Sequence, residues 1–495
     1  MKQIILLGGI LLSMATSCSN AKQTNETIVD NDTCKRIDKY LVQLAADKNF
    51  SGGLLIIKNG EKIFSKGYGW ADKENKIPFT PSTLASMGSI TKAFTAAAIM
   101  KLVEQGKLLV NDPLKKFLPM VPAEKANITI HQLLTHSSGF HEFLQNDGGD
   151  YEKIETEGFL KRAFTEPLAF KPGEKAVYTN VGMSILGIII EQVSGMDYES
   201  FLKKYLFEPI GIHGIGYHSS FSKTDTIAHG YQNGKDWGTI PQHIAATGNQ
   251  PYWNLKANGG LEASLDDIFI WANAFTNAGI LKDATIQQMF TPHIQEEGYN
   301  GQSSFGYGCN ISKSRRNTKM IDNGGSNGIY FARLIRLPKE GLIFYMVTNE
   351  SSINTNMVLP NVTQLYFTGK IVQDALTMQP KFESQMAAKI YQMLTHLKIT
   401  DLGEALKKEN MVVDNDMILL DAGRRLMAEK KTEEAFVLYQ YYTKTFPNII
   451  VSWNDLGDIY QLKNNKEEAI KCYKQALKLR PTNQRAKDNL DKLNK

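Results

Sequence analysis

Residues 80–113, TPSTLASMGSITKAFTAAAIMKLVEQGKLLVNDP, form the segment around which the rest of the chain is organised. Its centre is a Ser-x-x-Lys motif at Ser89 and Lys92, and the alanine-rich pattern that follows predicts a helix ending before Gly106. Residues three apart share a helix face, so we expect Lys92 to reach the hydroxyl of Ser89. Serine becomes a nucleophile when a nearby base takes its proton. Taken alone, a motif this short often occurs by chance, as a helix cap and a solvated lysine.

The flanking sequence favours the catalytic interpretation. Residues 79–81 (FTP), 88–95 (GSITKAFT), 109–113 (LVNDP) and 130–139 (IHQLLTHSSG) together resemble the serine β-lactamase and penicillin-binding-protein-like family. The resemblance is to the branch that contains class C β-lactamases, DD-peptidases, D-aminopeptidases and family VIII esterases, and it extends over residues 35–369. It implies an α/β fold with an antiparallel sheet flanked by helices, a helical subdomain, an active site between them, and no metal or organic cofactor.

A second motif follows a proline and a glycine, which favour a loop. Tyr178 and Asn180 stand two apart in this loop and resemble the family's Tyr-x-Asn motif. A phenol titrates near pH 10, so Tyr178 can act as a base only where a cation such as Lys92 favours the phenolate or shares its proton. The resemblance implies that Asn180 binds the substrate. The alternative is a tyrosine packed beneath a loop.

The third motif departs from the family pattern. Residues 322–328 (DNGGSNG) align with Lys-Thr-Gly or His-x-Gly, and Gly324 and Gly325 would let an edge strand lie close to the substrate. The resemblance implies that the N–H groups of Gly325 and Ser89 form an oxyanion hole. Asp322 stands where the family has a cation.

An anion at that position would repel the carboxylate of a β-lactam or of a peptide C-terminus. Replacing Asp322 by lysine or histidine is then expected to raise the turnover of an anionic β-lactam. Two alternatives stay open: Asp322 pairs with Lys92 or another cation and never meets substrate, or the enzyme is degraded.

These motifs together predict a serine hydrolase that forms an acyl-enzyme. The expected substrate is a small molecule or peptide, an ester or amide that is neutral or carries an amine, rather than a β-lactam. The rival hypothesis is a non-catalytic cell-envelope protein that binds a ligand through the same domain and recruits a partner through its C-terminal part.

Composition excludes several other classes of function. Apolar and charged fractions of 42% and 22% are typical of a soluble globular protein, and a net charge of +5 over 495 residues gives no reason to expect nucleic acid as a partner. The four cysteines and nine histidines are spaced in ways that predict neither a disulfide framework nor a metal site.

The N-terminus has the pattern of a targeting segment. Residues 1–17 combine a lysine with a short apolar run, and Cys18 follows a sequence that resembles a lipobox, although Ala15 stands where leucine is usual. We therefore expect export, lipidation of Cys18, a polar tether over 18–34, and anchoring in a bacterial cell envelope, on a periplasmic or outer-membrane face. An ordinary secretory signal is the alternative.

The C-terminal part contains a repeat. Small residues, aromatics and a proline recur 34 residues apart, which is typical of tetratricopeptide repeats over 416–449 and 450–483, followed by a capping helix. Residues 370–415 are predicted to be a helical connector. The repeats either bind a protein or peptide partner or serve as a stabilising appendage.

Overall fold

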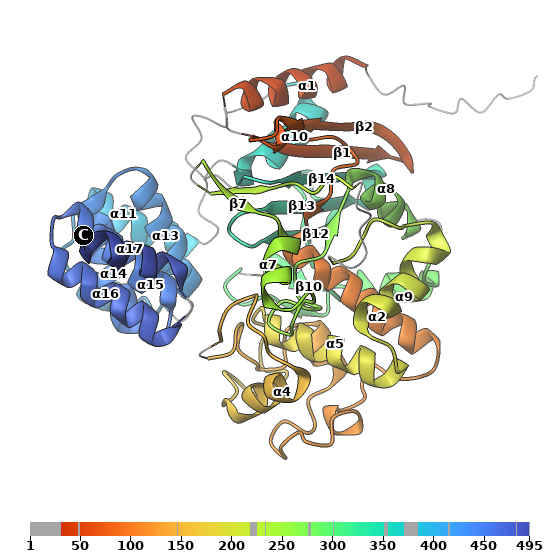
Figure 1. The fold of residues 1–495 in the computed structure, drawn as a ribbon, viewed down its shortest axis with the longest axis horizontal. Helices are drawn as coiled ribbons and strands as arrows, with labels where there is room; N and C mark the ends of the chain where they lie inside the picture. Colours follow the sequence, from red (N-terminus) through yellow and green to blue (C-terminus); the bar gives the residue numbers. More distant parts are fainter. Residues whose placement is uncertain are drawn as a thin grey trace, which may run out of the picture.

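The computed structural model describes residues 31–47, 50–145, 147–217, 225–232, 234–275, 279–299, 301–350, 355–370, 385–413, 416–481 and 483–494. Its helices and strands form an α/β domain, up to α10, and an all-helical C-terminal domain beside it (Figure 1). The expected signal segment and Cys18 lie outside the described residues.

An eight-stranded antiparallel sheet in the order β2-β1-β14-β13-β12-β11-β10-β9 is the centre of the first domain. Its strands are β1 Gly52–Lys58, β2 Glu61–Tyr68, β9 Ile294–Gln295, β10 Ser303–Phe305, β11 Asn310–Lys313, β12 Lys319–Ser326, β13 Phe331–Leu337 and β14 Leu342–Thr348. Three small two-stranded pairs join β3 Trp70–Asp72 to β4 Ile77–Pro78, β5 Ala85–Ser86 to β8 Glu262–Ala263, and β6 Gly230–Gln232 to β7 Lys235–Gly238.

The apolar run in β1 is explained by burial on both faces of the sheet. Leu54 and Ile56 lie in one hydrophobic core, whereas Leu55 and Ile57 lie in another, as the alternation of a strand requires. The turn into β2 uses Asn59 and Gly60, both with positive φ (50° and 86°), as a two-residue hairpin favours.

The helices of this domain cover the two faces of the sheet or form a helical subdomain beside it. They are α1 Asn31–Ala46, α2 Thr91–Glu104, α3 Ile130–Leu134, α4 Thr156–Thr165, α5 Asn180–Ser194, α6 Tyr198–Leu202, α7 Ile240–Thr247, α8 Leu265–Ala274, α9 Asp283–Met289 and α10 Thr355–Thr368. α1 packs on α10 over one face, where Asn361 Nδ2 donates a hydrogen bond of 3.1 Å to Tyr40 Oη. α8 lies on the opposite face.

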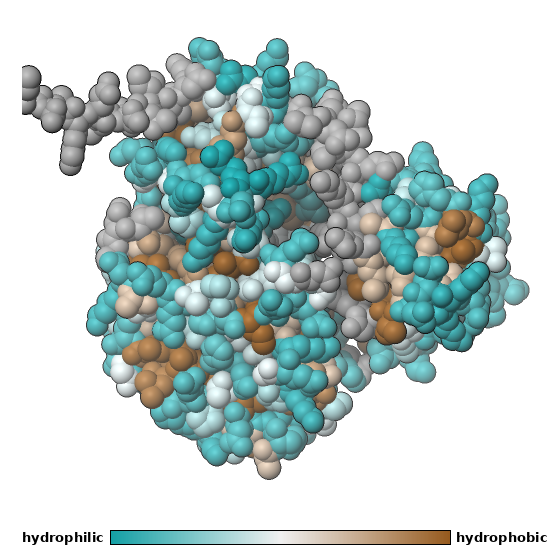
Figure 2. All heavy atoms as spheres, turned by 180° about the vertical axis from the view of Figure 1, so that it is seen from behind, coloured by the Kyte–Doolittle hydropathy of each residue, from teal (hydrophilic) through white to brown (hydrophobic). Residues whose placement is uncertain are grey.

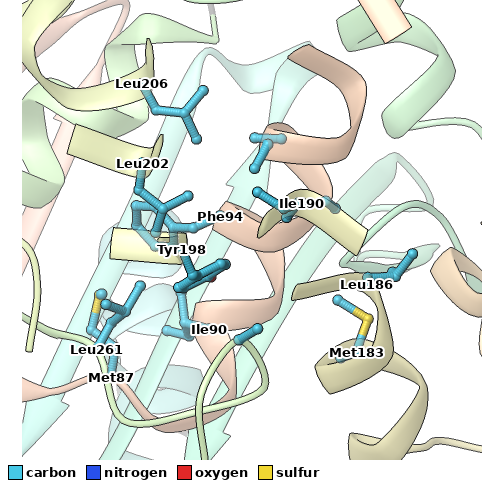
Figure 3. Close-up of a cluster of buried hydrophobic side chains, with 14 of the residues drawn as sticks. Met87, Ile90, Phe94, Met183, Leu186, Ile190, Tyr198, Leu202, Leu206 and Leu261 are labelled. Atoms are coloured by element: carbon cyan, nitrogen blue, oxygen red, sulfur yellow. The ribbon is translucent and has the colours of Figure 1, made fainter. Parts of the chain in front are cut away.

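α2 is surrounded by apolar side chains, which fixes the position of its N-terminus. Figure 3 shows Met87, Ile90 and Phe94 from this segment among side chains of α5 and α6 and beside Leu261. Phe94 also stacks on Trp271 of α8, with ring centroids 4.1 Å apart. The first turn of α2 is therefore held rigidly between the sheet and the helical subdomain.

The C-terminal domain consists of antiparallel helix pairs. Its helices are α11 Gln385–His396, α12 Leu402–Lys408, α13 Asp416–Ala428, α14 Thr432–Thr445, α15 Ile450–Leu462, α16 Lys466–Leu479 and α17 Gln484–Asn494. Gly423 and Gly457 lie against the rings of Tyr439 and Tyr473, where a Cβ would be about 2.7 and 2.6 Å from ring atoms. α11 and α12, from the expected connector, pack into the core of these repeats.

Seen from behind, the surfaces of both domains are mostly hydrophilic, with hydrophobic residues in separate patches (Figure 2). Within the described parts of the chain, no helix is both long enough and apolar enough to cross a bilayer.

Candidate active site

Ser89 lies in a 3-10 turn, Gly88–Ile90, that leads directly into α2. Gly88 has a φ of +52°, and a Cβ there would lie 2.7 Å from the backbone nitrogen of Ser326. Thr91 Oγ1 donates to the carbonyl of Gly88 at 2.7 Å and closes the turn. Glycine is thus required before Ser89, because the backbone of Gly88 is in the left-handed region and lies against the end of β12.

Lys92 is directed at Ser89 by two further contacts. Its Nζ lies 3.1 Å from Ser89 Oγ, 2.6 Å from Asn180 Oδ1 and 2.7 Å from the carbonyl oxygen of Asn258, and the side chain is 3% exposed. A neutral amine has two N–H donors and one lone pair. The two carbonyl oxygens accept both donors, which leaves the lone pair for the hydroxyl proton of Ser89.

Burial favours this neutral form. It lowers the pKa of Lys92 to about 7, against a smaller raising effect of the carboxyls of Glu142 and Asp150. A substantial fraction of Lys92 is therefore unprotonated at neutral pH and available as a general base.

Tyr178 completes this cluster, with the centre of its ring 4.7 Å from Lys92 Nζ. Burial raises the pKa of Tyr178, while its hydrogen bond with Ser89 lowers it in part. The phenol therefore stays protonated at neutral pH, so of the two expected ways in which Lys92 could activate it, this geometry fits a shared proton rather than a phenolate. This geometry suits Lys92 as the proton acceptor and Tyr178 as a hydrogen-bond donor and proton relay.

Two supporting residues were not among the sequence-predicted site residues. His136 Nδ1 accepts the N–H of Thr179 at 3.1 Å, and its ring packs on Tyr178 with centroids 4.9 Å apart. Burial, followed by the charge of Lys92, lowers the pKa of His136 to about 3, so the imidazole is neutral. Asn258, the second, supplies a backbone carbonyl, which no side-chain pattern reveals.

The end of β12 borders this cluster. β11 pairs with β12 as far as Asp322, so the edge beyond it is open. The N–H of Asn327 donates to the carbonyl of Tyr330 at 3.3 Å. Hydrogen-bonded and non-hydrogen-bonded pairs alternate along an antiparallel ladder, so the next pair, Ser326 and Phe331, is not hydrogen-bonded, and the pair after it, Gly325 and Ala332, is. The N–H of Gly325 therefore points toward β13, and that of Ser326 points to the open edge.

Close packing brings this edge to the nucleophile. A Cβ on Gly325 would lie 1.9 Å from the carbonyl oxygen of Met87 and 2.8 Å from the nitrogen of Ser89. At Gly324, by contrast, a Cβ would meet nothing within 4 Å. Gly325 thus provides the close contact, and Ser326 rather than Gly325 is placed to donate an N–H beside that of Ser89.

Asp322 faces away from the nucleophile. Its carboxylate accepts two hydrogen bonds from Arg333 on β13, Nε–Oδ1 at 3.0 Å and Nη2–Oδ2 at 2.6 Å. The next residue, Asn323, faces the other side of the strand, is buried, and donates from Nδ2 to the carbonyl of Gly308 at 2.6 Å. Of the alternatives for Asp322, the structure shows pairing with a cation, and that cation is Arg333 rather than Lys92.

The repeat domain contacts the loop that borders this site. Arg480 Nη2 donates to Asp147 Oδ1 at 2.7 Å. The same loop holds the first turn of α5, because the N–H of Asn180 donates to the carbonyl of Glu142 at 3.0 Å. Burial raises the pKa of Glu142 to about 7, and the charge of Asp416 in the repeat domain acts in the same direction.

The described residues contain no cluster of side chains that would bind a metal ion. No group of three or more histidine, cysteine, aspartate or glutamate side chains in those residues is arranged to hold a metal ion.

Comparisons with known proteins identify the family of this chain. The β-lactamase family model matches residues 37–362, and the tetratricopeptide repeat model matches residues 450–483. PbpX of Bacillus subtilis is 30% identical over 272 residues, covering 55% of this chain and 66% of PbpX. Protein flp of Staphylococcus aureus is 31% identical, and the match spans 42% of this chain and 43% of flp.

Solved structures share the fold. The octameric penicillin-binding protein homologue from Pyrococcus abyssi superimposes with a TM-score of 0.59 at 28% identity, covering 73% of this chain and 81% of its own. The D-amino acid amidase from Ochrobactrum anthropi superimposes with a TM-score of 0.58 over 68% of this chain and all of its own. At 21% identity, this likeness is evidence for the shared fold and for nothing more. Because the matched family model spans well over half of the chain, the chain belongs to the β-lactamase family, and it carries a C-terminal tetratricopeptide repeat.

Proposed function

We propose that the protein is a serine hydrolase that works through an acyl-enzyme. Ser89 Oγ attacks the acyl carbon while Lys92 takes its proton, and the N–H groups of Ser89 and Ser326 stabilise the oxyanion. Tyr178 passes the proton to the leaving group. Water then attacks the ester formed on Ser89 and releases the acid.

The observation that carries this proposal is the environment of Lys92. A buried amine with two carbonyl acceptors and a serine hydroxyl at 3.1 Å has its lone pair directed at a nucleophile. A lysine with a purely structural role would instead be paired with a carboxylate or exposed to solvent.

The proposed substrate is an ester or amide that is neutral or carries an amine. Asn323, which occupies the face of β12 toward the nucleophile, is neutral, and Asp322 is neutralised by Arg333. The carboxyls of Glu142 and Asp150 lie close enough to Lys92 to affect its pKa. An anionic substrate would thus find a neutral side chain at Asn323, a guanidinium already paired with Asp322, and two carboxyl groups near Lys92.

The test is covalent labelling of the purified full-length chain with a fluorophosphonate, followed by intact-protein mass spectrometry. We expect one adduct in the wild type, none in Ser89→Ala, and slower labelling in Lys92→Ala and Tyr178→Phe. Absence of labelling in a wild-type sample that melts cooperatively would contradict the proposal and favour a ligand-binding role.

We also propose that Cys18 carries a lipid anchor and that the repeats bind a protein or peptide. The lipobox-like sequence supports the first and the 34-residue repeat supports the second. Incorporation of a palmitate analogue that persists in Cys18→Ala would contradict the anchor.

A further inference from the structure

We infer that Glu262 binds an ammonium group of the substrate, within a site whose walls are the rings of Tyr151, Trp237 and Tyr330. Its ligand would be a primary ammonium carried on the acyl part of an ester or amide. The inference rests on the proposed acyl transfer at Ser89 and specifies the substrate class of that reaction.

Glu262 is a buried carboxyl group that the fold leaves unsatisfied. Its side chain is 0% exposed, and neither Oε1 nor Oε2 has a hydrogen-bond partner among the described residues. Burying such a group without a partner is unfavourable, so its retention needs an explanation. Leu261 and Ala263 on either side point into the main hydrophobic core, so Glu262 points to the opposite face of β8.

That face adjoins the nucleophile. β8 pairs with β5 so that Glu262 lies opposite Ser86, and side chains of such a pair share one face of the sheet. Ser86 Oγ accepts the N–H of Gly88 at 3.3 Å, and Gly88 immediately precedes Ser89. The carboxyl group thus lies beside the turn that carries the reacting hydroxyl.

A group of aromatic rings lies within electrostatic range of the same carboxyl group. The ring of Trp237 lies 6.1 Å from that of Tyr330, edge to face, and 6.3 Å from that of Tyr151. Burial raises the pKa values of Tyr151 and Tyr330, the charge of Asp150 raises that of Tyr151 further, and the charge of Glu262 raises both, so both phenols lie within electrostatic range of this carboxyl. Aromatic faces attract ammonium ions, and a carboxylate supplies the counter-charge.

The charge state of Glu262 fits an ammonium ligand. Burial raises the pKa of Glu262 to about 8, and no cation of the described residues offsets this effect. The group is therefore mostly protonated at neutral pH when alone. An ammonium ion beside it would favour the carboxylate, and the bound pair would be neutral overall.

The test compares substrates that differ by one charge. Alanine phenyl esters, D and L, carry an α-ammonium where the isobutyrate ester carries a methyl group, and 6-aminohexanoate and heptanoate phenyl esters form the same comparison for a distant ammonium. We expect the kcat/KM ratio of the charged to the neutral ester to fall at least tenfold in Glu262→Gln for one of the two series. The series that responds identifies where the ammonium sits.

Glu340→Gln is the matched control. Glu340 also has one buried oxygen without a hydrogen-bond partner, but it lies in the turn between β13 and β14. Its variant is expected to keep the wild-type ratio in both series. Ratios in Glu262→Gln within twofold of the wild type in both series would overturn the inference.

If the Glu262 variant does not fold, a measurement on the wild type tests the inference instead. Butylammonium is expected to slow fluorophosphonate labelling at a concentration at least fivefold lower than butan-1-ol, and equal potency would overturn the inference. If the wild type neither labels nor hydrolyses any ester, the proposed function fails. The inference is then judged by melting temperature, where butylammonium but not butan-1-ol should stabilise the wild type.

Discussion

The pH dependence of acylation tests the role of Lys92 directly. A lysine with the ordinary pKa of 10.5 is neutral to about 0.03% at pH 7, whereas one with a pKa of about 7 is neutral to about half. Burial therefore raises the amount of active base at pH 7 by about a thousandfold. Below the pKa, the rate should fall about tenfold for each pH unit, and above it the rate should level off.

The assay is the second-order rate constant of fluorophosphonate labelling at Ser89 between pH 5 and pH 9, because the probe does not ionise in that range. We expect a single inflection near pH 7. Lys92→Arg should remove the rise, since a guanidinium stays protonated throughout. A flat profile, or a rate that still rises about tenfold per pH unit up to pH 9 in folded protein, would refute the assignment of Lys92 as the base.

Two neighbouring carboxyls titrate in the same range and provide a control. Burial raises the pKa of Glu142 to about 7 and that of Asp150 to about 6. Both carboxylates raise the pKa of Lys92. If Lys92 is the base, Glu142→Gln and Asp150→Asn should each keep the inflection and move it to lower pH; loss of the inflection in either variant would assign it to that carboxyl.

Three further predictions concern the surrounding groups. Asn180→Asp places a carboxylate 2.6 Å from Lys92 Nζ, which should move the inflection upward by about 1–3 pH units; an unchanged profile would contradict the contact. Gly325→Ala should lower the free energy of unfolding by about 1–3 kcal/mol and abolish labelling, because its Cβ would overlap the Met87 carbonyl. Gly324→Ala should change the free energy of unfolding by less than about 1 kcal/mol, because its Cβ would meet nothing within 4 Å. Equal melting temperatures of the two variants would be inconsistent with this packing. Asp322→Lys would place a cation beside Arg333, so it should lower the free energy of unfolding by about 1.5–3 kcal/mol without raising the turnover of a β-lactam. A gain in β-lactam turnover would support the electrostatic role expected from the sequence.

The sequence predicts much of this architecture because the relevant signals are local. The antiparallel sheet with flanking helices and the repeat are confirmed by the family and structural comparisons. Ser89 and Lys92 are three residues apart, so one turn of helix suffices to bring them together. Tyr178 and Asn180 share a short segment, and the structure brings both of them to Lys92.

The rest depends on relations that a local pattern does not encode. Hydrogen-bonded pairs alternate along the β12–β13 ladder, and this alternation decides whether the N–H of Gly325 or that of Ser326 faces the substrate. A shift of one residue in a strand exchanges the two faces, which is why Asn323 rather than Asp322 faces the nucleophile. Asn258 contributes a main-chain carbonyl from a distant segment, and Glu262 is conspicuous only once its burial is known.

The pairing of the first and last strands of the α/β domain has a mechanical consequence. The chain enters β1 at Gly52 and leaves β14 at Thr348, which are register partners, and α1 and α10 pack together over the same face of the sheet. Tension applied between the N-terminal segment and the repeats would therefore act on this one layer. Ser89 and β12 lie outside this layer, but the Arg480–Asp147 ion pair also links the repeats to the loop beside the nucleophile. That ion pair would have to break before β1 and β14 alone carried the load and the nucleophile was spared it.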